Sequence, residues 1–270
     1  MGNQKYLMES DDETYRLDVK TDDKTTQEQA LWAGIKPGMR VADLGFGSGK
    51  TTFILNQLVQ PGGEVVGIDS AADRINYAKE NYPHKNIVYI QRDIRNALED
   101  LGKFDFVWIR FVLEYYRSSN FEIVKHVSKI LKPGGILHLI DLDHNCLCHY
   151  GHSDRLEKTL FNLLNTIQIK GDFDAFAGRK LYSYLYDLKY ENINVAMAPH
   201  HLIYGEPDKV DIFNWNQKIQ IAVKQLGFNF IEYPGGYDEF YEEFMSFFQN
   251  PRRLTYTPLF SCRGEKPHFG

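Results

Sequence analysis

The sequence has few cysteines, no long apolar run and no strong net charge. Only three of its 270 residues are cysteines, an odd number that argues against a disulfide scaffold and suits a reducing compartment. No stretch reaches the roughly 18 apolar residues that span a bilayer, and the first residues lack the apolar segment of a signal peptide. The formal net charge of -5 gives no field that would gather nucleic acid or an anionic membrane. We therefore expect a cytoplasmic protein with neither partner.

The most informative positive feature is a glycine-rich segment, VADLGFGSG, over residues 41–49. It reads as an apolar strand that ends in Asp43, followed by Gly45, Gly47 and Gly49 at alternate positions. Glycine lets the backbone turn tightly at a strand end while a ligand lies against it. A second apolar strand ends at Asp69, and 69 minus 49 places it 20 residues beyond the loop, the offset of a ribose-holding acid. The pattern predicts a cofactor that contains a nucleoside.

The spacing of the glycines narrows the choice of cofactor. A dinucleotide loop has the form G-x-G-x-x-G, whereas this loop reads G-x-G-x-G. Gly49-Lys50-Thr51 imitates a phosphate-binding P-loop, but that motif would need a glycine where this chain has Leu44. Asp43 would also repel a triphosphate, while it suits a ligand that carries ammonium and sulfonium groups. The charge therefore favours a cationic ligand.

Together, four segments resemble the class I S-adenosylmethionine-dependent methyltransferases over roughly residues 40–141. These are the loop from Asp43 to Gly49, Gly67-Ile68-Asp69-Ser70, Gln91-Arg92-Asp93-Ile94, and the run LKPGGILHLID over residues 131–141. The resemblance implies S-adenosylmethionine as the cofactor and transfer of its methyl group to oxygen, nitrogen or carbon of an acceptor. S-adenosylhomocysteine would be the second product.

The order of apolar and amphipathic segments predicts an α/β fold. Strands at 40–44, 64–69, 87–92, 104–109 and 136–141 alternate with helices at 50–59, 72–82 and 121–131, which indicates a doubly wound, mainly parallel sheet. Residues 133–135 read as the tight turn before the fifth strand. Further helices are predicted at 154–169, 178–188, 210–226 and 238–248, and strands at 191–204 and 255–263.

With the resemblance, these elements form one Rossmann-like domain with a seven-stranded sheet over residues 1–270. An N-terminal helical arm covers 1–33, a cofactor-binding half covers 34–145, and lid helices with the acceptor side cover 146–270. Tyr6, Arg16 and Lys20 of the arm are candidates for contact with ligand.

The resemblance assigns roles to individual residues. Asp43 would pair with the methionyl ammonium, Asp69 would hold the ribose, and Asp93 with Ile94 would face the adenine. Ser70 is a further cofactor-binding residue. Arg110 would meet the methionyl carboxylate or the acceptor. The remaining cofactor contacts would come from the backbone of Gly45, Gly47 and Gly49.

The acceptor is predicted to be a small molecule. The fourth strand ends in Trp108-Ile109-Arg110-Phe111 rather than in the Asn/Asp-Pro-Pro-aromatic motif of amino-methylating DNA enzymes. The Pro-Cys nucleophile of the cytosine type is also absent, because no cysteine of the sequence follows a proline. His144, a few residues beyond the fifth strand, is the candidate general base, with Asp141 or Asp143 to orient it. The candidate pocket walls are Phe111, Tyr115, His144, His149, Phe176, Arg179, His200, His201 and Tyr204.

Other functions remain open at this level. Cys146 and Cys148 lie among histidines and aspartates, but their spacing matches no zinc motif, so no metal site is predicted. A P-loop-like nucleotide hydrolase is the rival activity, because Gly49-Lys50-Thr51 and the strand that ends at Asp141 imitate two phosphate-binding motifs. A non-catalytic S-adenosylmethionine-binding protein is the third interpretation. Nothing in the sequence indicates an oligomeric state.

Overall fold

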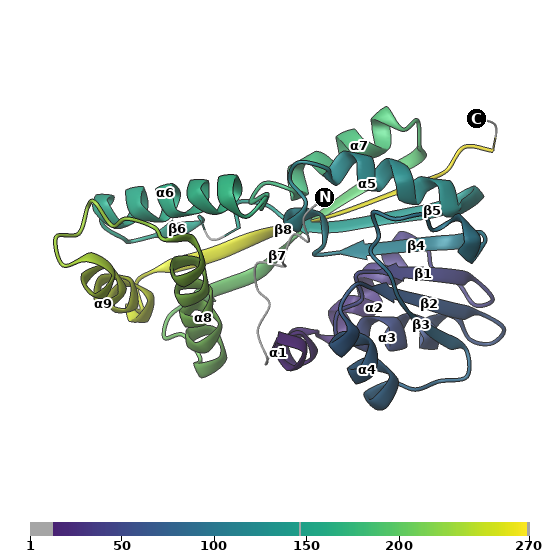
Figure 1. Ribbon diagram of the computed structural model, residues 1–270, viewed down its shortest axis with the longest axis horizontal. Helices are drawn as coiled ribbons and strands as arrows, with labels where there is room; N and C mark the ends of the chain where they lie inside the picture. The colour runs from purple at the N-terminus through teal and green to yellow at the C-terminus, as the bar shows by residue number, and fades with distance from the viewer. Residues whose placement is uncertain (1–12, 146, 269–270) are drawn as a thin grey trace.

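The centre of the molecule is a mixed sheet, seen in a computed structural model that describes residues 13–145 and 147–268. Five strands run parallel in the order β3-β2-β1-β4-β5, β8 lies antiparallel to β5, and β7 lies antiparallel to β8 (Figure 1). The strands are β1 (Arg40–Leu44), β2 (Glu64–Asp69), β3 (Ile87–Gln91), β4 (Phe104–Arg110), β5 (Leu131–Leu142), β6 (His149–Tyr150), β7 (Glu191–Tyr204) and β8 (Leu254–Glu265). The predicted doubly wound fold is confirmed. The eighth strand is the two-residue β6, which pairs with β8 and is too short to leave a sequence pattern.

Helices cover both faces of the sheet, which explains why its central strands are apolar on both sides. In Figure 1, α5 and α7 lie above β5, while α2, α3 and α4 lie in the lower half of the picture, next to β1, β2 and β3. Their bounds are α2 (Asp23–Ala33), α3 (Lys50–Val59), α4 (Ala72–Asn81), α5 (Asn120–Val127) and α7 (Leu181–Asp187). Single helical turns are η1 (Glu99–Leu101), η2 (Leu113–Tyr115), η3 (Ser128–Ile130) and η4 (Gly178–Lys180).

The long ribbon of β7 and β8 continues beyond the end of β5 and carries a helical subdomain (Figure 1). We define this subdomain as α6 (Asp154–Lys170), α8 (Lys209–Leu226) and α9 (Gly236–Gln249). Its core gathers Leu156 and Leu160 of α6 with Trp215, Phe240 and Phe244. The apolar stripe of α6 is therefore packing. Across the residues described, every helix is too short or too polar to cross a bilayer.

The segment 133–135 corrects one sequence expectation. It is not a turn before β5 but part of that strand, where the register moves from Leu131 opposite Phe104 to Ile136 opposite Phe106. The extra residues form a bulge, in which Gly134 has a φ of +75° and its N–H donates to the Lys266 carbonyl at 2.8 Å. Pro133, Gly134 and Gly135 therefore form the bulge, and Gly134 connects it to the C-terminal segment at Lys266.

The described part of the N-terminal arm consists of α1 (Glu13–Lys20) and α2. Asp22 caps α2 by accepting a hydrogen bond from the Thr25 N–H at 2.8 Å. Gly34 ends the helix in a left-handed conformation with a φ of +99°. Figure 1 shows α1 beside the ends of the central strands. Tyr6 lies outside the described residues.

Candidate functional site

The glycine loop lies between β1 and α3 and adopts left-handed backbone angles. Gly45 has a φ of +75°, and a Cβ atom there would lie 2.5 Å from Cγ2 of Val112. Gly47 has a φ of +65°, and its Cβ would lie 3.1 Å from Cδ1 of Leu17 in α1. Both positions therefore favour glycine for the backbone angle, and Gly45 also needs it for space. The loop is enclosed by the segment after β4 on one side and by the N-terminal arm on the other.

Asp69 joins the end of β2 to this loop. One carboxylate oxygen accepts a hydrogen bond from the Gly47 N–H at 3.0 Å, and the other accepts from the Ala71 N–H at 3.0 Å. The guanidinium of Arg74 lies 3.6 Å from the second oxygen. Asp69 is buried yet lines the cavity that the loop surrounds. A carboxylate held this way presents its remaining lone pairs to a ligand with hydroxyl groups.

Asp43 lies one residue before the end of β1 and is almost completely buried. Its carboxylate accepts a hydrogen bond from the Thr52 hydroxyl of α3 at 2.7 Å. Burial raises the pKa of Asp43 to about 7, the hydrogen bond from Thr52 opposes this rise, and the nearby Asp69 adds to it. A cationic ligand in the cavity would favour the ionised form of Asp43.

Arg110 ends β4 on the same side of the sheet as Asp43. Its guanidinium lies 4.3 Å from the centre of the Phe111 ring. Within residues 13–145 and 147–268, no hydrogen-bond partner is found for its buried Nε. Burial lowers the pKa of Arg110 to about 10, and the group stays cationic at neutral pH. This side chain is therefore suited to an anionic ligand group.

These groups surround one cavity at the C-terminal ends of the parallel strands. This is where ligands bind in open α/β sheets. Leu17 and Thr21 of the arm, Tyr115 and Tyr116 of the segment after β4, and the glycine loop form its walls. The full lining is Leu17, Thr21, Asp43, Gly45, Phe46, Gly47, Ser48, Thr51, Asp69, Ser70, Arg74, Arg92, Ile94, Trp108, Arg110, Phe111, Val112, Tyr115 and Tyr116.

The structure brings most of the predicted cofactor residues to this cavity and leaves two outside it. Gly49 is the N-cap of α3, and a Cβ atom there would lie 2.5 Å from Cβ of Ala78, so glycine at this position allows α3 to pack closely against α4. Asp93 turns away and forms an ion pair with Arg95, with Nε 3.0 Å from each carboxylate oxygen. Ile94, the residue beside it, does line the cavity. The expected contact of Asp93 with adenine gains no support from this geometry.

His144 also lies away from the cavity. It has a φ of +47° in the loop after β5, and its ring packs edge-on against Phe176 at 5.1 Å between centroids. The two aspartates expected to orient it have other partners: Asp143 is ion-paired with Arg179, and Asp141 accepts from the Glu114 and Leu142 N–H groups. General-base catalysis by His144 stays a prediction without geometric support.

The expected acceptor walls divide into two groups. Phe111 and Tyr115 line the cavity, and the Phe111 ring lies 4.9 Å from that of His200 on β7. The others lie elsewhere: His149 packs on Trp215, Phe176 and Arg179 stack on each other, His201 packs beside His200, and Tyr204 is exposed. Phe111 has a φ of +58°, which is unusual for a bulky residue and marks a strained position.

Several cavity residues were missed from the sequence. Leu17, Thr21 and Val112 reach the site through contacts between segments far apart in the chain, and no local pattern reveals such contacts. Arg74 had a usable signal, because it lies in the first turns of the helix after Asp69. Arg16 and Lys20 of the arm were expected to touch ligand: Arg16 is ion-paired with Glu13, and the Lys20 ammonium lies 5.8 Å from the Phe111 ring.

The described residues of the two rival sequence features do not form a site of their own. Lys50, which a nucleotide hydrolase would direct at phosphates, is ion-paired with Asp23 at 3.0 Å. Among the residues that the structure describes, no group of three or more histidines, cysteines or acids has metal-binding geometry. Cys146 lies outside those residues, while Cys148 and Cys262 are free thiols.

A glycine cradle at the first strand, an acid at the end of the second, and the order β3-β2-β1-β4-β5 with antiparallel β8 define the class I methyltransferase fold. The chain belongs to the methyltransferase domain family, whose model matches residues 35–186. The resemblance seen in the sequence is thereby confirmed.

Curated relatives carry methyltransferase names. The chain is 31% identical over 116 residues to demethylmenaquinone methyltransferase of Lactococcus lactis, a match that covers 42% of this chain and 46% of that protein. It is 36% identical over 113 residues to an uncharacterized methyltransferase of Synechocystis, covering 40% and 49%. It is 30% identical over 197 residues to a proposed methyltransferase of Invertebrate iridescent virus 6, covering 69% and 67%. The chain thus spans about half the length of the first two relatives.

Solved structures share the fold at low sequence identity. A proposed methyltransferase of Bacillus halodurans has a TM-score of 0.59 at 17% identity, covering 90% of this chain and 99% of that one. The cyclase SpnF has a TM-score of 0.53 at 18% identity, covering 91% and 80%. Since a cyclase shares the fold, the likeness in structure does not by itself define the reaction.

Proposed function

We propose that this protein transfers a methyl group from S-adenosylmethionine to a small-molecule acceptor and releases S-adenosylhomocysteine. The observation that carries the proposal is the position of Asp69. Its carboxylate links the end of β2 to the glycine loop through the Gly47 N–H and lines the cavity. An acid held there suits the two hydroxyl groups of the cofactor's ribose. The glycine loop leaves room for the part of the cofactor that continues from the ribose toward its amino-acid end.

The charged groups fit the amino-acid end of this cofactor. Asp43 would attract its ammonium, and the guanidinium of Arg110 would donate hydrogen bonds to its carboxylate. Both side chains belong to neighbouring strands, since Asp43 pairs in register with Trp108, two residues before Arg110. Ile94 would pack against the adenine. Asp93 would reach the adenine only after leaving Arg95, so we expect a smaller contribution from it.

When bound, the cofactor supplies an already activated methyl group, and the chain contributes mainly alignment and exclusion of water. Leu17 packs over the glycine loop, Thr21 lines the cavity beside it in the N-terminal arm, and both would shield the bound molecule from solvent. Phe111, beside Arg110, and Tyr115 both present aromatic rings to the cavity. These rings would hold the acceptor in line with the methyl group.

The same aromatic wall supports an acceptor with a flat, apolar ring. Phe111, Tyr115 and Tyr116 offer ring faces and edges for stacking. The formal net charge of -5 disfavours a nucleic-acid acceptor. The names of relatives that methylate demethylmenaquinone agree with a ring acceptor. The atom that receives the methyl group is open among oxygen, nitrogen and carbon.

Ligand binding by the purified protein tests this function. Native mass spectrometry should find S-adenosylmethionine or S-adenosylhomocysteine, and isothermal titration with S-adenosylhomocysteine should show one site per chain. A screen of hydroxylated naphthalenes and quinols with radiolabelled S-adenosylmethionine would then identify the acceptor. Bound ATP with magnesium-dependent phosphate release, or no binding of either sulfur compound, would contradict the proposal.

A further inference from the structure

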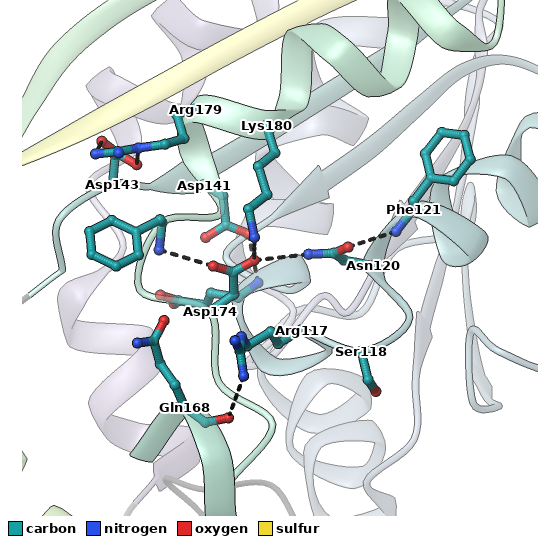
Figure 2. A network of polar contacts seen from close by, with 12 residues as sticks. Arg117, Ser118, Asn120, Phe121, Asp141, Asp143, Gln168, Asp174, Arg179 and Lys180 are labelled. Carbon is teal, nitrogen blue, oxygen red and sulfur yellow. Dashed lines mark hydrogen bonds and ion pairs between the residues drawn. The ribbon is translucent and has the colours of Figure 1, made fainter. Parts of the chain in front are cut away.

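The segment after β4, residues 111–120, forms one wall of the cofactor cavity but is held in place from outside it. Its anchor is the segment 172–176, which follows α6 of the helical subdomain. We call the contacts between these two segments the clamp. Figure 2 shows its centre, with Lys180 and Asn120 both directed toward the carboxylate of Asp174.

Asp174 makes the main contacts of the clamp and is 1% exposed. One carboxylate oxygen accepts hydrogen bonds from the Asn120 side-chain amide at 3.0 Å and from the Lys180 ammonium. The other accepts from the Phe176 N–H at 3.1 Å. Its own N–H donates to the Glu114 carbonyl at 2.6 Å. Asp174 therefore connects η2, the start of α5 and η4.

A second acid supports the same connection two residues earlier. Asp172 accepts hydrogen bonds from both the N–H and the hydroxyl of Ser118, each at 2.8 Å. The carbonyl of Asp172 accepts from the Arg117 N–H at 2.8 Å. The backbone of Asp172 has a φ of +52°, a strained value that these contacts hold in place. The two segments are thus joined at four positions along the wall.

The wall is fixed from β5 as well. Asp141 accepts a hydrogen bond from the Glu114 N–H at 3.1 Å, and the Glu114 carboxylate accepts from the Asn145 amide at 3.0 Å. Burial, with Glu114 and Asp174 nearby, raises the pKa of Asp141 well above its ordinary value. Lys180 is the cation that the clamp contacts directly.

The residues between these anchors are Tyr115 and Tyr116, and both line the cavity. The Tyr115 ring packs on Phe173, a residue of the clamp segment, at 5.6 Å between centroids. The cavity wall and the clamp are therefore one packed unit.

We propose that Asp174 is a positioning residue for the cofactor cavity. By holding the Glu114 backbone and the Asn120 side chain, it sets where Tyr115 and Tyr116 stand in the wall. The end of α6 is then coupled to the cavity: ligand that orders the wall also orders residues 172–176. This inference rests on the proposed function, because S-adenosylhomocysteine is the ligand used to detect the coupling.

The test compares wild type with Asp174→Leu, which removes three accepted hydrogen bonds and keeps the number and branching of the side-chain heavy atoms. At a temperature where circular dichroism shows the variant fully folded, isothermal titration should give about tenfold weaker binding of S-adenosylhomocysteine. Hydrogen–deuterium exchange should show ligand protection of both 113–116 and 172–176 in wild type. In the variant, protection at 172–176 should be lost.

Matched variants separate positioning from lost stability. Asp174→Asn keeps an oxygen for the Phe176 N–H and should bind with an intermediate affinity. Leu160→Ala weakens the core of the helical subdomain without touching the clamp, and should lower the melting temperature while binding remains as in wild type. If Asp174→Leu does not fold, Asn120→Asp takes its place: it keeps the oxygen that accepts from the Phe121 N–H and sets a carboxylate against Asp174.

Each result has one meaning. Wild-type affinity in folded Asp174→Leu, or in Asn120→Asp, would overturn the positioning role. So would protection of 113–116 without any at 172–176 in wild type, or an equal loss of affinity in Leu160→Ala. No binding by wild type would instead reject the proposed function and leave the clamp as packing alone.

Discussion

The N–H of Gly47 donates to the carboxylate of Asp69 over 3.0 Å, across the ends of two neighbouring parallel strands. The glycine belongs to the loop after β1, and the acid is the last residue of β2. One bond therefore ties together the two features that the sequence singles out separately. Because the acid positions the loop as well as facing the cavity, its removal should affect both.

Asp69→Ala should weaken binding of S-adenosylhomocysteine by about 10- to 100-fold, the effect of losing hydrogen bonds that involve a charged group. The variant should still fold, because the strand's apolar residues are unchanged. Isothermal titration measures the loss. Asp73→Ala, at an exposed position in the first turn of α4, is the matched control and should bind as wild type does. Equal affinity in the two variants would remove Asp69 from the site.

Gly45→Ala should abolish measurable binding, because its Cβ would lie 2.5 Å from Cγ2 of Val112 and the φ of +75° is unfavourable for alanine. Val112→Ala removes the atom that clashes. The double variant should therefore recover part of the binding, while Val112→Ala alone should bind nearly as well as wild type. Titration of all three proteins separates the steric cause from the backbone cause. No recovery in the double variant would mean that backbone strain alone decides the effect.

Binding should depend on pH through Asp43. Its pKa of about 7 in the free protein is raised by burial, and a cationic ammonium favours the ionised carboxylate. Affinity should therefore rise as pH increases toward 7 and then level off, being about tenfold weaker at about pH 6 than at about pH 8. Asp43→Asn should bind weakly at both values and show no such slope. A wild-type affinity that is flat across this range would mean that Asp43 does not pair with the ammonium.

The raised pKa of Asp43 makes the stability of the ligand-free protein change with pH in the opposite direction to its affinity for the ligand. The folded state holds a proton on Asp43 that the unfolded state loses above the ordinary aspartate pKa of 3.8. The free energy of unfolding should therefore fall as pH rises between about 4 and 7 through this group. Urea titrations of wild type and Asp43→Asn, compared at several pH values, should show a smaller fall in the variant.

Local sequence patterns predicted the strands of the sheet and some of the residues that line the cavity. Both leave a signal in residues that are adjacent in the chain. The strands 40–44 and 191–204 were predicted at the bounds that the structure has, since apolar runs between turn signals mark them. Asp69, Gly45 and Gly47, which line the cavity, were singled out because a strand end followed by a turn is a local feature of the sequence. The bulge at 133–135 was misread because proline and glycine signal turns and bulges alike.

What the sequence could not reveal is contact between distant segments. Val112 and Leu17 enclose the loop only because β4 pairs with β1 and α1 packs against α4. His144 was placed near the cavity on the assumption that residues after β5 turn toward the cofactor. Instead, its positive φ and its packing on Phe176 direct it elsewhere. The clamp is also non-local, since Asp174 meets Asn120 across 54 residues of chain.

His144→Asn should leave binding of S-adenosylhomocysteine unchanged, because the ring lies outside the cavity. Asparagine tolerates the φ of +47°, so the loop should keep its conformation. Once an acceptor is known, the rate should also be close to that of wild type between about pH 6 and 9, with no loss of the low-pH limb. A drop of about 100-fold or more in the maximal rate would restore this histidine as the general base.

Arg110→Met should reduce affinity for ligands with a carboxylate and spare those without one. The guanidinium faces the cavity beside Asp43 and Phe111, where it would donate to the methionyl carboxylate. S-adenosylhomocysteine should therefore bind about tenfold or more weakly to the variant, the cost of a lost charge-assisted bond. Methylthioadenosine keeps the nucleoside but lacks the amino-acid group, so its affinity should change little. Arg110→Lys keeps the charge without the planar fork and should give an intermediate loss for the first ligand only. If both ligands lose affinity equally, Arg110 shapes the cavity and does not recognise the carboxylate. If neither ligand loses affinity, Arg110 does not bind the cofactor, and its guanidinium would contact the acceptor instead.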